Sequence, residues 1–270
     1  MSPDSAYKDD PLSVEGIRKR LTHKELELRV FPTISSTNTV LKQMASDGAP
    51  GGLALLAEAQ TAGRGRQGRS FYSPSGTGLY MSLMLRPEME LSQAPLLTSC
   101  AAVAVCEALE SLGDVHPGIK WVNDIYLAGR KICGILTESG IDTRTGRLSY
   151  VVVGIGINLR TPEGDFPEEI RSVAGSAFGT KDIPELRNRL AALVLDRLVD
   201  SAVHPDAQEI FEKYRSWSLA PGKSILILAP GQDPIPAQAL SLERDYALRV
   251  RLPDGTEHLL RSGEISIRLC

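Results

Sequence analysis

The most constraining stretch of the sequence is residues 60–70, which read Gln-Thr-Ala-Gly-Arg-Gly-Arg-Gln-Gly-Arg-Ser. Three arginines and three glycines share positions 63–69, and no apolar side chain larger than Ala62 could anchor the stretch in a core. Glycine lets the backbone bend sharply and approach a ligand, while arginine offers a planar fork of donors to carboxylate or phosphate oxygens. The stretch predicts a flexible cationic loop that binds an anion. From these residues alone, a solvated loop or an arginine–glycine segment that binds nucleic acid stays an alternative.

Apolar patterns around this loop alternate between strands and helices. Residues 53–59 form an apolar run that predicts a buried strand, so the loop follows the carboxyl end of a strand, where sites in α/β folds often lie. Further strands are expected at 26–31 (ending at Pro32), 79–85, 119–127 (with a polar interruption), 132–136 and 150–157. Helices are expected at 15–23, 39–45, 96–112, 184–198 and 207–217. Glycine inside the run 150–157 indicates that something approaches that backbone closely.

The last fifty residues change character. Short alternating runs at 223–228, 236–242, 247–252 and 265–269 are separated by turn residues, which predicts a small all-β unit. A chain of 270 residues is long enough for one large domain and one small domain.

Composition narrows the functional classes. The formal net charge of -3 argues against a protein that binds nucleic acid through a broad basic face. The four cysteines and four histidines are scattered, so neither a zinc site nor a disulfide framework is indicated, and Cys100 and Cys106 are expected to be buried thiols in a helix. The N-terminal residues contain no apolar core of a signal peptide, and we expect no apolar run close to the roughly 18 residues that a membrane span needs. These features favour a soluble, cytoplasmic protein without a membrane partner.

Five segments, taken in order, resemble the biotin protein ligase family. They are Ser36-Thr37-Asn38, Gln60 with 63–69, Lys120-Trp121-Val122-Asn123-Asp124, residues 129–136, and Gly154-Ile155-Gly156-Ile157-Asn158. The tail Ser262 to Arg268 is similar to the end of that family's small C-terminal barrel. The resemblance implies an α+β fold: a mixed-sheet catalytic core of the biotin/lipoate protein ligase type, related to class II aminoacyl-tRNA synthetase cores, with a C-terminal SH3-like β-barrel. It implies a tail and short helix at 1–24, a catalytic domain at 25–217 and a β domain at 218–270.

The implied reaction has two steps. Biotin and ATP, with Mg²⁺, form biotinyl-5'-AMP and pyrophosphate, and biotin is then transferred to one lysine of the carrier domain of acetyl-CoA carboxylase or another biotin-dependent carboxylase. Joining a carboxylate to a phosphate brings two anions together, so positioned cations must offset their repulsion. A loop that closes over the product would protect a mixed anhydride from water.

The resemblance also assigns residues to roles. Biotin binding falls to Ser36, Thr37, Asn38, Gln60, Arg64, Gly65, Arg66 and Lys131. ATP binding falls to Arg66, Arg69, Phe71, Lys120, Asn123, Asp124 and Asn158. Catalysis falls to Lys131, Arg64 and Arg66, and Asp124 is the candidate Mg²⁺ ligand. The residues themselves leave other roles open: Ser36 and Thr37 could simply cap a helix, Lys131 could be a charged turn residue, and Asn123 with Asp124 could form a buried structural pair.

Two positions depart from the family pattern. Val122 stands where the family often has proline, and valine is expected to keep an extended backbone. Phe71 stands where the family often has tryptophan, so the hypothesis is that less stacking surface weakens nucleotide affinity.

Competing functions follow from the same residues. A lipoate or octanoate ligase shares the catalytic core, and a non-catalytic biotin-binding module is the alternative from another class. Only about 25 residues precede the first expected strand, fewer than a helix-turn-helix module needs, so we expect a monofunctional ligase without operator DNA binding. A homodimer is left open.

Overall fold

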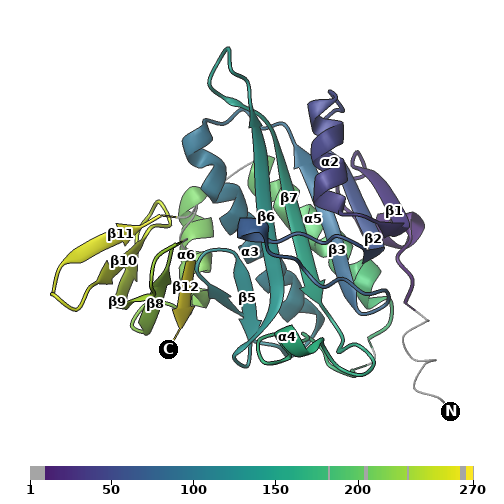
Figure 1. The fold of residues 1–270 in the computed structure, drawn as a ribbon. Coiled ribbons are helices and arrows are strands. Elements are labelled where there is room, and N and C mark those ends of the chain that lie inside the picture. Colours follow the sequence, from purple (N-terminus) through teal and green to yellow (C-terminus); the bar gives the residue numbers. More distant parts are fainter. Residues whose placement is uncertain (1–9, 182, 204–205, 230, 262–265, 270) are drawn as a thin grey trace.

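A seven-stranded mixed sheet forms the centre of the larger part of the chain (Figure 1). The computed structural model describes residues 10–181, 183–203, 206–229, 231–261 and 266–269. In spatial order the strands are β1 (Glu27–Ile34), β2 (Leu53–Gln60), β3 (Gly78–Leu85), β7 (Leu148–Asn158), β6 (Arg130–Ile141), β5 (Asp124–Leu127) and β4 (Gly118–Lys120). Only β1 and β2 run parallel, and every other neighbouring pair in this sheet is antiparallel. The expected α+β class with a mixed sheet is confirmed.

Helices cover both faces of this sheet. They are α1 (Val14–Arg18), α2 (Thr37–Ser46), α3 (Ala94–Leu112), α4 (Glu168–Arg171), α5 (Leu186–Val203) and α6 (Ala207–Trp217). The larger core joins Val151 and Val153 of β7 to residues of α3 and α5, whereas Val152 packs with Leu41 of α2 in a second cluster. Because successive strand residues point to opposite faces, α2 lies on one face of the sheet and α3 and α5 on the other.

The helix α3 is strongly apolar along its whole length. By length and composition alone its 19 residues could cross a membrane, so the expectation that no run approaches a span is wrong as stated. The helix is nevertheless mostly buried against the sheet, which is how the core helix of a folded domain behaves.

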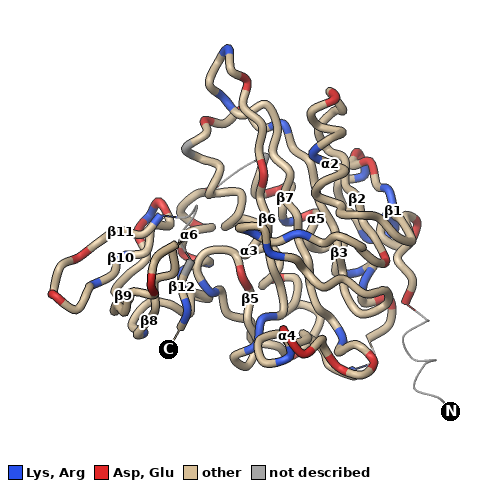
Figure 2. Tube along the Cα trace, viewed as in Figure 1, with Lys and Arg blue, Asp and Glu red and all other residues tan. Residues whose placement is uncertain are grey.

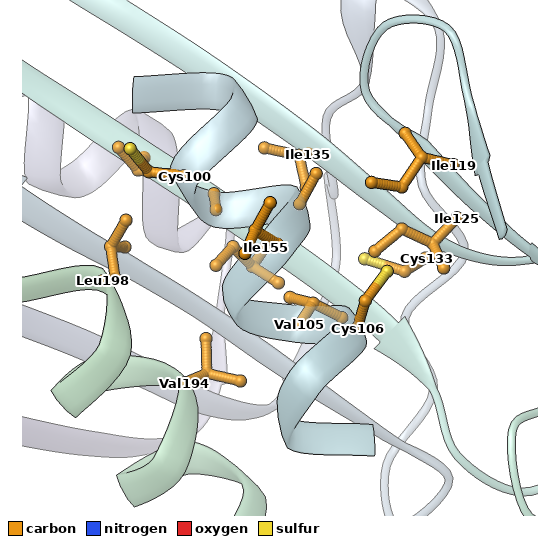
Figure 3. Packing of buried hydrophobic residues seen from close by; sticks show 14 of the residues in the cluster. Cys100, Val105, Cys106, Ile119, Ile125, Cys133, Ile135, Ile155, Val194 and Leu198 are labelled. Atoms are coloured by element: carbon orange, nitrogen blue, oxygen red, sulfur yellow. The ribbon is translucent and has the colours of Figure 1, made fainter. Parts of the chain in front are cut away.

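Figure 3 shows Cys106 of α3 and Cys133 of β6 pointing toward one another in this core. Cys100, Cys106 and Cys133 are buried free thiols, as expected for the two helical ones, and Cys270 lies outside the described residues.

A second, five-stranded antiparallel sheet follows α6. Its order is β11 (Glu257–Leu260), β10 (Leu248–Arg251), β9 (Ile235–Leu242), β8 (Ser224–Leu228) and β12 (Ser266–Leu269). This sheet confirms the all-β unit and is consistent with an SH3-like domain. It packs on the larger part through Trp121, whose indole Nε1 donates to the Tyr246 carbonyl at 2.9 Å. The ring of Tyr214 also packs on Tyr246, with 5.3 Å between the two ring centroids. The exact domain boundaries stay a prediction.

Three expectations about elements need correction. The strand at 26–31 does not stop at Pro32 but continues to Ile34, because β1 is an edge strand and a proline there removes no hydrogen bond that the sheet needs. The helix expected at 15–23 ends at Arg18, and the helix expected from Pro184 begins at Leu186, after Glu185 adopts a left-handed φ of 52°.

Other details of the sequence-based assignment also differ. Val122 does not continue an extended strand: residues 121–123 form a turn between β4 and β5, and the Trp121–Val122 peptide is cis. The strand β11 was not expected, since it presents exposed side chains up to Leu260. The expected N-terminal tail falls mainly on residues 1–9, and most of the family-like C-terminal motif, Ser262 to Arg268, falls on residues 262–265. Both therefore lie largely outside the described residues.

Arg187 of α5 connects this helix to the sheet. Its side chain is only 4% exposed, and it donates to Glu58 Oε2 of β2 at 2.6 Å and to the Gly78 carbonyl at the start of β3 at 2.9 Å. Removing one partner of a buried ion pair leaves the other charge uncompensated.

We therefore expect Arg187→Met to lower the free energy of unfolding by about 3 kcal/mol, measured by urea denaturation. Arg197→Met is the matched control, since Arg197 lies on the same helix and pairs with Glu107 at 3.1 Å but stays 28% exposed. Its expected loss is below about 1 kcal/mol. Equal losses in the two variants would contradict the importance given to the Arg187 pair.

Candidate functional site

A cavity of about 390 Å³ opens on the α2 face of the large sheet. Its floor is formed by β7, β6 and β3, and its walls by the start of α2, the loop after β2, residues 120–126 and part of the small sheet. The loop after β2, residues 61–70 and here called the arginine loop, crosses in front of β6 and β7 (Figure 1). The cavity therefore lies between the sheet and the loop that the sequence singled out.

Glycines shape the floor of the cavity. A Cβ atom added to Gly154 would stand 2.5 Å from Asn38 Oδ1, and one added to Gly156 would stand 2.7 Å from the Phe71 ring. Both distances are shorter than a van der Waals contact, so a side chain at either position would displace a wall of the cavity. The expectation that glycine in this strand marks a close approach is confirmed, and the approaching groups are Asn38 and Phe71.

One end of the cavity is lined by neutral hydrogen-bonding groups. Ser36 caps α2, because its hydroxyl accepts from the Thr39 amide at 3.4 Å, while the Thr37 amide donates to Gln60 Oε1 at 2.9 Å. Gln60 in turn donates through Nε2 to the Ser73 hydroxyl at 3.0 Å. The capping role considered for Ser36 is therefore present, and the side chain also lines the cavity.

Asn38 lies next to this group and is held from two sides. Its Nδ2 donates to Glu138 Oε2 at 2.7 Å, and its Oδ1 accepts from the Ser82 hydroxyl at 3.2 Å. The same Glu138 oxygen accepts from Arg64 Nη1 at 2.9 Å. Arg64 thus lines the cavity while one nitrogen of its guanidinium is paired with a carboxylate, and its role toward an anionic ligand stays a prediction.

The other end of the cavity carries most of the charges. Lys131 Nζ donates to Asp124 Oδ1 at 2.6 Å, and Arg66 Nη1 donates to Asn123 Oδ1 at 2.9 Å. Asn123 is fixed by its own Nδ2, which donates to the Ile135 carbonyl at 2.8 Å. Burial lowers the pKa of Lys120, and the nearby Asp124 opposes that shift only in part.

The cavity is strongly cationic although the protein is not. Six cationic side chains line it among the described residues, against the single acid Asp124; they are Arg64, Arg66, Arg69, Lys120, Lys131 and Arg268. Elsewhere Lys and Arg are interspersed with Asp and Glu (Figure 2). Cations gathered in a partly enclosed space favour an anionic ligand. Among the described residues, no group of three His, Cys, Asp or Glu side chains could hold a metal alone.

The structure gathers every site residue that the sequence proposed. All line this one cavity: Ser36, Thr37, Asn38, Gln60, Arg64, Gly65, Arg66, Arg69, Phe71, Lys120, Asn123, Asp124, Lys131 and Asn158. Lys131 is not a turn residue, since it is the second residue of β6 and its ammonium reaches Asp124. The individual roles in binding and catalysis stay predictions.

Sequence reasoning missed several residues of the site. Glu138 and Ser82 support Asn38 and are recognisable only from contacts between distant segments. Arg268 of β12 brings the small sheet into the cavity wall, and the family-like tail that contains it was the available signal. Residues 170–174 add another wall, because the Lys131 amide donates to the Val173 carbonyl at 2.8 Å.

Fold and site together define an α+β protein with a cationic cavity, suited to an anionic ligand, beneath a glycine- and arginine-rich loop. Comparison with known proteins gives the family. The family described as "Biotin/lipoate A/B protein ligase family" matches residues 30–158. The chain is 32% identical to "Bifunctional ligase/repressor BirA" of Escherichia coli over 88% of its own length and 73% of that protein's. It is 31% identical to "Biotin--[acetyl-CoA-carboxylase] ligase" of Mycobacterium tuberculosis over 76% of each chain. The protein belongs to the biotin/lipoate protein ligase family.

A solved structure supports the same relationship. The chain superposes on "Biotin protein ligase from Aquifex aeolicus in complex with biotin and ATP" with a TM-score of 0.71 and 28% identity, covering 90% of this chain and 99% of that one. Some relatives are longer: the match to "Bifunctional ligase/repressor BirA" of Bacillus spizizenii, at 43% identity, covers 53% of this chain but only 43% of that protein.

The close packing at Gly154 can be tested without a ligand. We expect Gly154→Ala to lower the free energy of unfolding by about 1–3 kcal/mol, because the new methyl group overpacks a buried site against Asn38. Gly134→Ala is the control, since the nearest atoms to its Cβ would be the end of Lys131 and the Phe71 ring at 3.4 Å. Chemical denaturation measures both, and a Gly154→Ala variant as stable as the control would contradict this packing.

Proposed function

We propose that the protein is an ATP-dependent ligase that activates biotin as biotinyl-5'-AMP and transfers the biotinyl group to a lysine of a biotin carboxyl carrier domain. The observation that carries the proposal is the division of the cavity into a neutral hydrogen-bonding end and a cationic end. Biotin has a ureido ring at one end and a carboxylate at the other. A related protein of known structure was solved with biotin and ATP.

The neutral end matches the ureido ring. That ring offers one carbonyl acceptor and two N–H donors, which need uncharged partners. Ser36, Thr37, Asn38 and Gln60 provide hydroxyl and amide groups already oriented by hydrogen bonds to one another or to their surroundings. A lipoyl group has no such ring, which is why biotin is proposed in preference to lipoate or octanoate.

The cationic end matches the reacting groups. In the first step a carboxylate oxygen attacks the α-phosphorus of ATP and pyrophosphate leaves. In the second step the carrier lysine nitrogen attacks the acyl carbon, loses a proton, and AMP leaves. Lys131, Arg64 and Arg66 would offset the repulsion between the two anions in the first step, and Arg69, which also lines the cavity, would add to their charge. Phe71 and Asn158 would contact the adenine, and Gly65 would let the arginine loop approach the ligand.

Asp124 is the one acid among the described cavity residues, so its carboxylate is the candidate ligand for Mg²⁺. Magnesium is usually bound by one or two carboxylates together with substrate phosphates, so a single carboxylate beside a phosphate site fits MgATP. Lys120 and Asn123, on the same side of the cavity, would contact the phosphates. The ion would screen phosphate charge, while Asp124 also orients the Lys131 ammonium.

The remaining parts of the proposal concern partners and place. We infer a cytoplasmic enzyme that acts on the carrier domain of acetyl-CoA carboxylase or another biotin-dependent carboxylase. The absence of operator DNA binding stays a prediction, and a salt-sensitive, sequence-specific shift of a DNA fragment would contradict it. Sedimentation at several protein concentrations would decide whether a homodimer forms.

One experiment tests the proposed reaction. The protein is incubated with biotin, MgATP and a carrier domain, and mass spectrometry is used to detect one biotinyl addition on a carrier lysine. Lipoate replaces biotin in a parallel reaction. Lipoyl transfer without biotinyl transfer would favour the lipoate ligase alternative, and binding of biotin without transfer would favour the non-catalytic module.

Lys131→Ala separates catalysis from binding. Because the ammonium charge is most useful where new charge develops in the transition state, we expect adenylate formation to slow about 100-fold, with the biotin dissociation constant rising less than about fivefold. Pyrophosphate release and calorimetric titration with biotin measure the two effects. Adenylate formation at the parent rate would show that the role assigned to Lys131 is wrong.

A further inference from the structure

The carboxylate of Glu138 connects three parts of the site. Glu138 lies in β6, opposite Val152 of β7, and its side chain is only 15% exposed. Its Oε2 accepts from Asn38 of α2 at 2.7 Å and from Arg64 of the arginine loop at 2.9 Å. Its Oε1 accepts from Lys42, one turn further along α2, at 2.8 Å. Glu138 is not among the residues to which ligand binding or catalysis has been assigned.

The first consequence concerns the orientation of Asn38. A carboxylate only accepts hydrogen bonds at neutral pH, so Glu138 selects the amide nitrogen of Asn38 as its partner. The amide oxygen then faces the Ser82 hydroxyl, and it lies above Gly154, where no side chain intervenes. Asn38 therefore presents one fixed pattern of donor and acceptor to the cavity.

The second consequence concerns the arginine loop. Within the loop the Gly65 amide donates to the Arg69 carbonyl at 2.7 Å, so the loop forms a small closed turn. The Arg64 contact with Glu138 ties this turn to β6 across the rim of the cavity. Burial alone would raise the pKa of Glu138, but hydrogen bonds from Lys42 and Asn38 and the charge of Arg64 outweigh it, so its pKa lies below the ordinary value. The carboxylate is thus charged at neutral pH.

We propose that Glu138 is a positioning residue that holds the arginine loop over the cavity and fixes Asn38 in the orientation that receives the ligand. It acts through Arg64 and Asn38 and need not touch the ligand itself. The part of this proposal that concerns biotin rests on the proposed function, whereas the loop contact can be tested on the protein alone.

Limited trypsin digestion tests the loop contact without any ligand. Trypsin cleaves after arginine, and the loop offers Arg64, Arg66 and Arg69 as sites. We expect Glu138→Gln to speed cleavage within the loop about fivefold, equivalent to about 1 kcal/mol at 1.4 kcal/mol per tenfold. Lys42→Met is the matched control, because it removes a cation from the same carboxylate without touching the loop, and its expected change is below about twofold.

A double variant shows whether the two residues act through one contact. Arg64→Gln removes the loop partner and one cleavage site, so cleavage is compared at Arg66 and Arg69 only. If Glu138 acts through Arg64, adding Glu138→Gln to Arg64→Gln produces no further acceleration. If the effects of the two substitutions on the cleavage rate multiply, or if Glu138→Gln is cleaved in the loop at the parent rate, the proposal that Glu138 holds the loop is overturned.

Steady-state kinetics tests the consequence for the ligand. In Glu138→Gln we expect the KM for biotin to rise about tenfold, because Asn38 lies at the neutral end of the cavity, and the KM for ATP to rise less, about threefold, because the loop also carries Arg66 and Arg69. Glu138→Asp keeps the charge and is expected to recover part of the loss. Equal changes in both KM values together with a lower unfolding temperature would indicate a purely structural role and overturn the proposal.

The two tests separate the two hypotheses. If the parent protein binds no biotin but Glu138→Gln still speeds cleavage in the loop, the hold on the loop stands and the proposed function fails. If the parent protein forms biotinyl-5'-AMP but cleavage and the KM for biotin are unchanged in Glu138→Gln, the function stands and the positioning role fails.

Discussion

The rest of this structure depends on the difference between the two faces of β7, one of which carries apolar side chains and the other glycines. Val151 and Val153 bury their side chains in the large apolar core to which α3 and α5 also contribute. On the opposite face Gly154 and Gly156 offer bare backbone, so that Asn38 and Phe71 can approach the strand. One strand thereby supplies both the stability of the domain and the floor of its cavity. A side chain on the second face would fill space that the site needs.

Charge placement follows from this geometry. The protein as a whole is slightly acidic, yet the cavity above the glycine floor gathers six cations and one acid among its described lining residues. Cations crowded together repel one another unless something compensates them. Asp124 compensates Lys131 at 2.6 Å, and Glu138, at the rim, compensates Arg64 and Lys42. The remaining positive potential is available to an anionic ligand, and a partly enclosed site weakens the screening by water and salt.

The sequence predicted the strands of the large sheet, most of its helices and all the site residues proposed for the cavity, because these follow from local apolar patterns and from motifs that keep their order along the chain. It could not predict what depends on partners far away in sequence. Pro32 stays in a strand because that strand lies at the sheet edge. Glu138 is important through contacts with residues 74 and 100 positions away. Arg268 reaches the cavity only because the small sheet packs beside β4 and β5.

The same distant contacts determine how firmly the arginine loop is held. Backbone hydrogen bonds fix the start of the loop, where the Ala62 amide donates to the Ser35 carbonyl at 2.8 Å. Further along, Arg64 donates to Glu138 of the sheet and Arg66 donates to Asn123 beside it. An ion pair in which the arginine is 44% exposed contributes only about 0.2–1 kcal/mol. Contacts of that size bias a loop toward one position without locking it there. A loop fixed by buried apolar side chains would cost far more to open, and a cavity that must admit a ligand and then shield it is better served by weak polar ties.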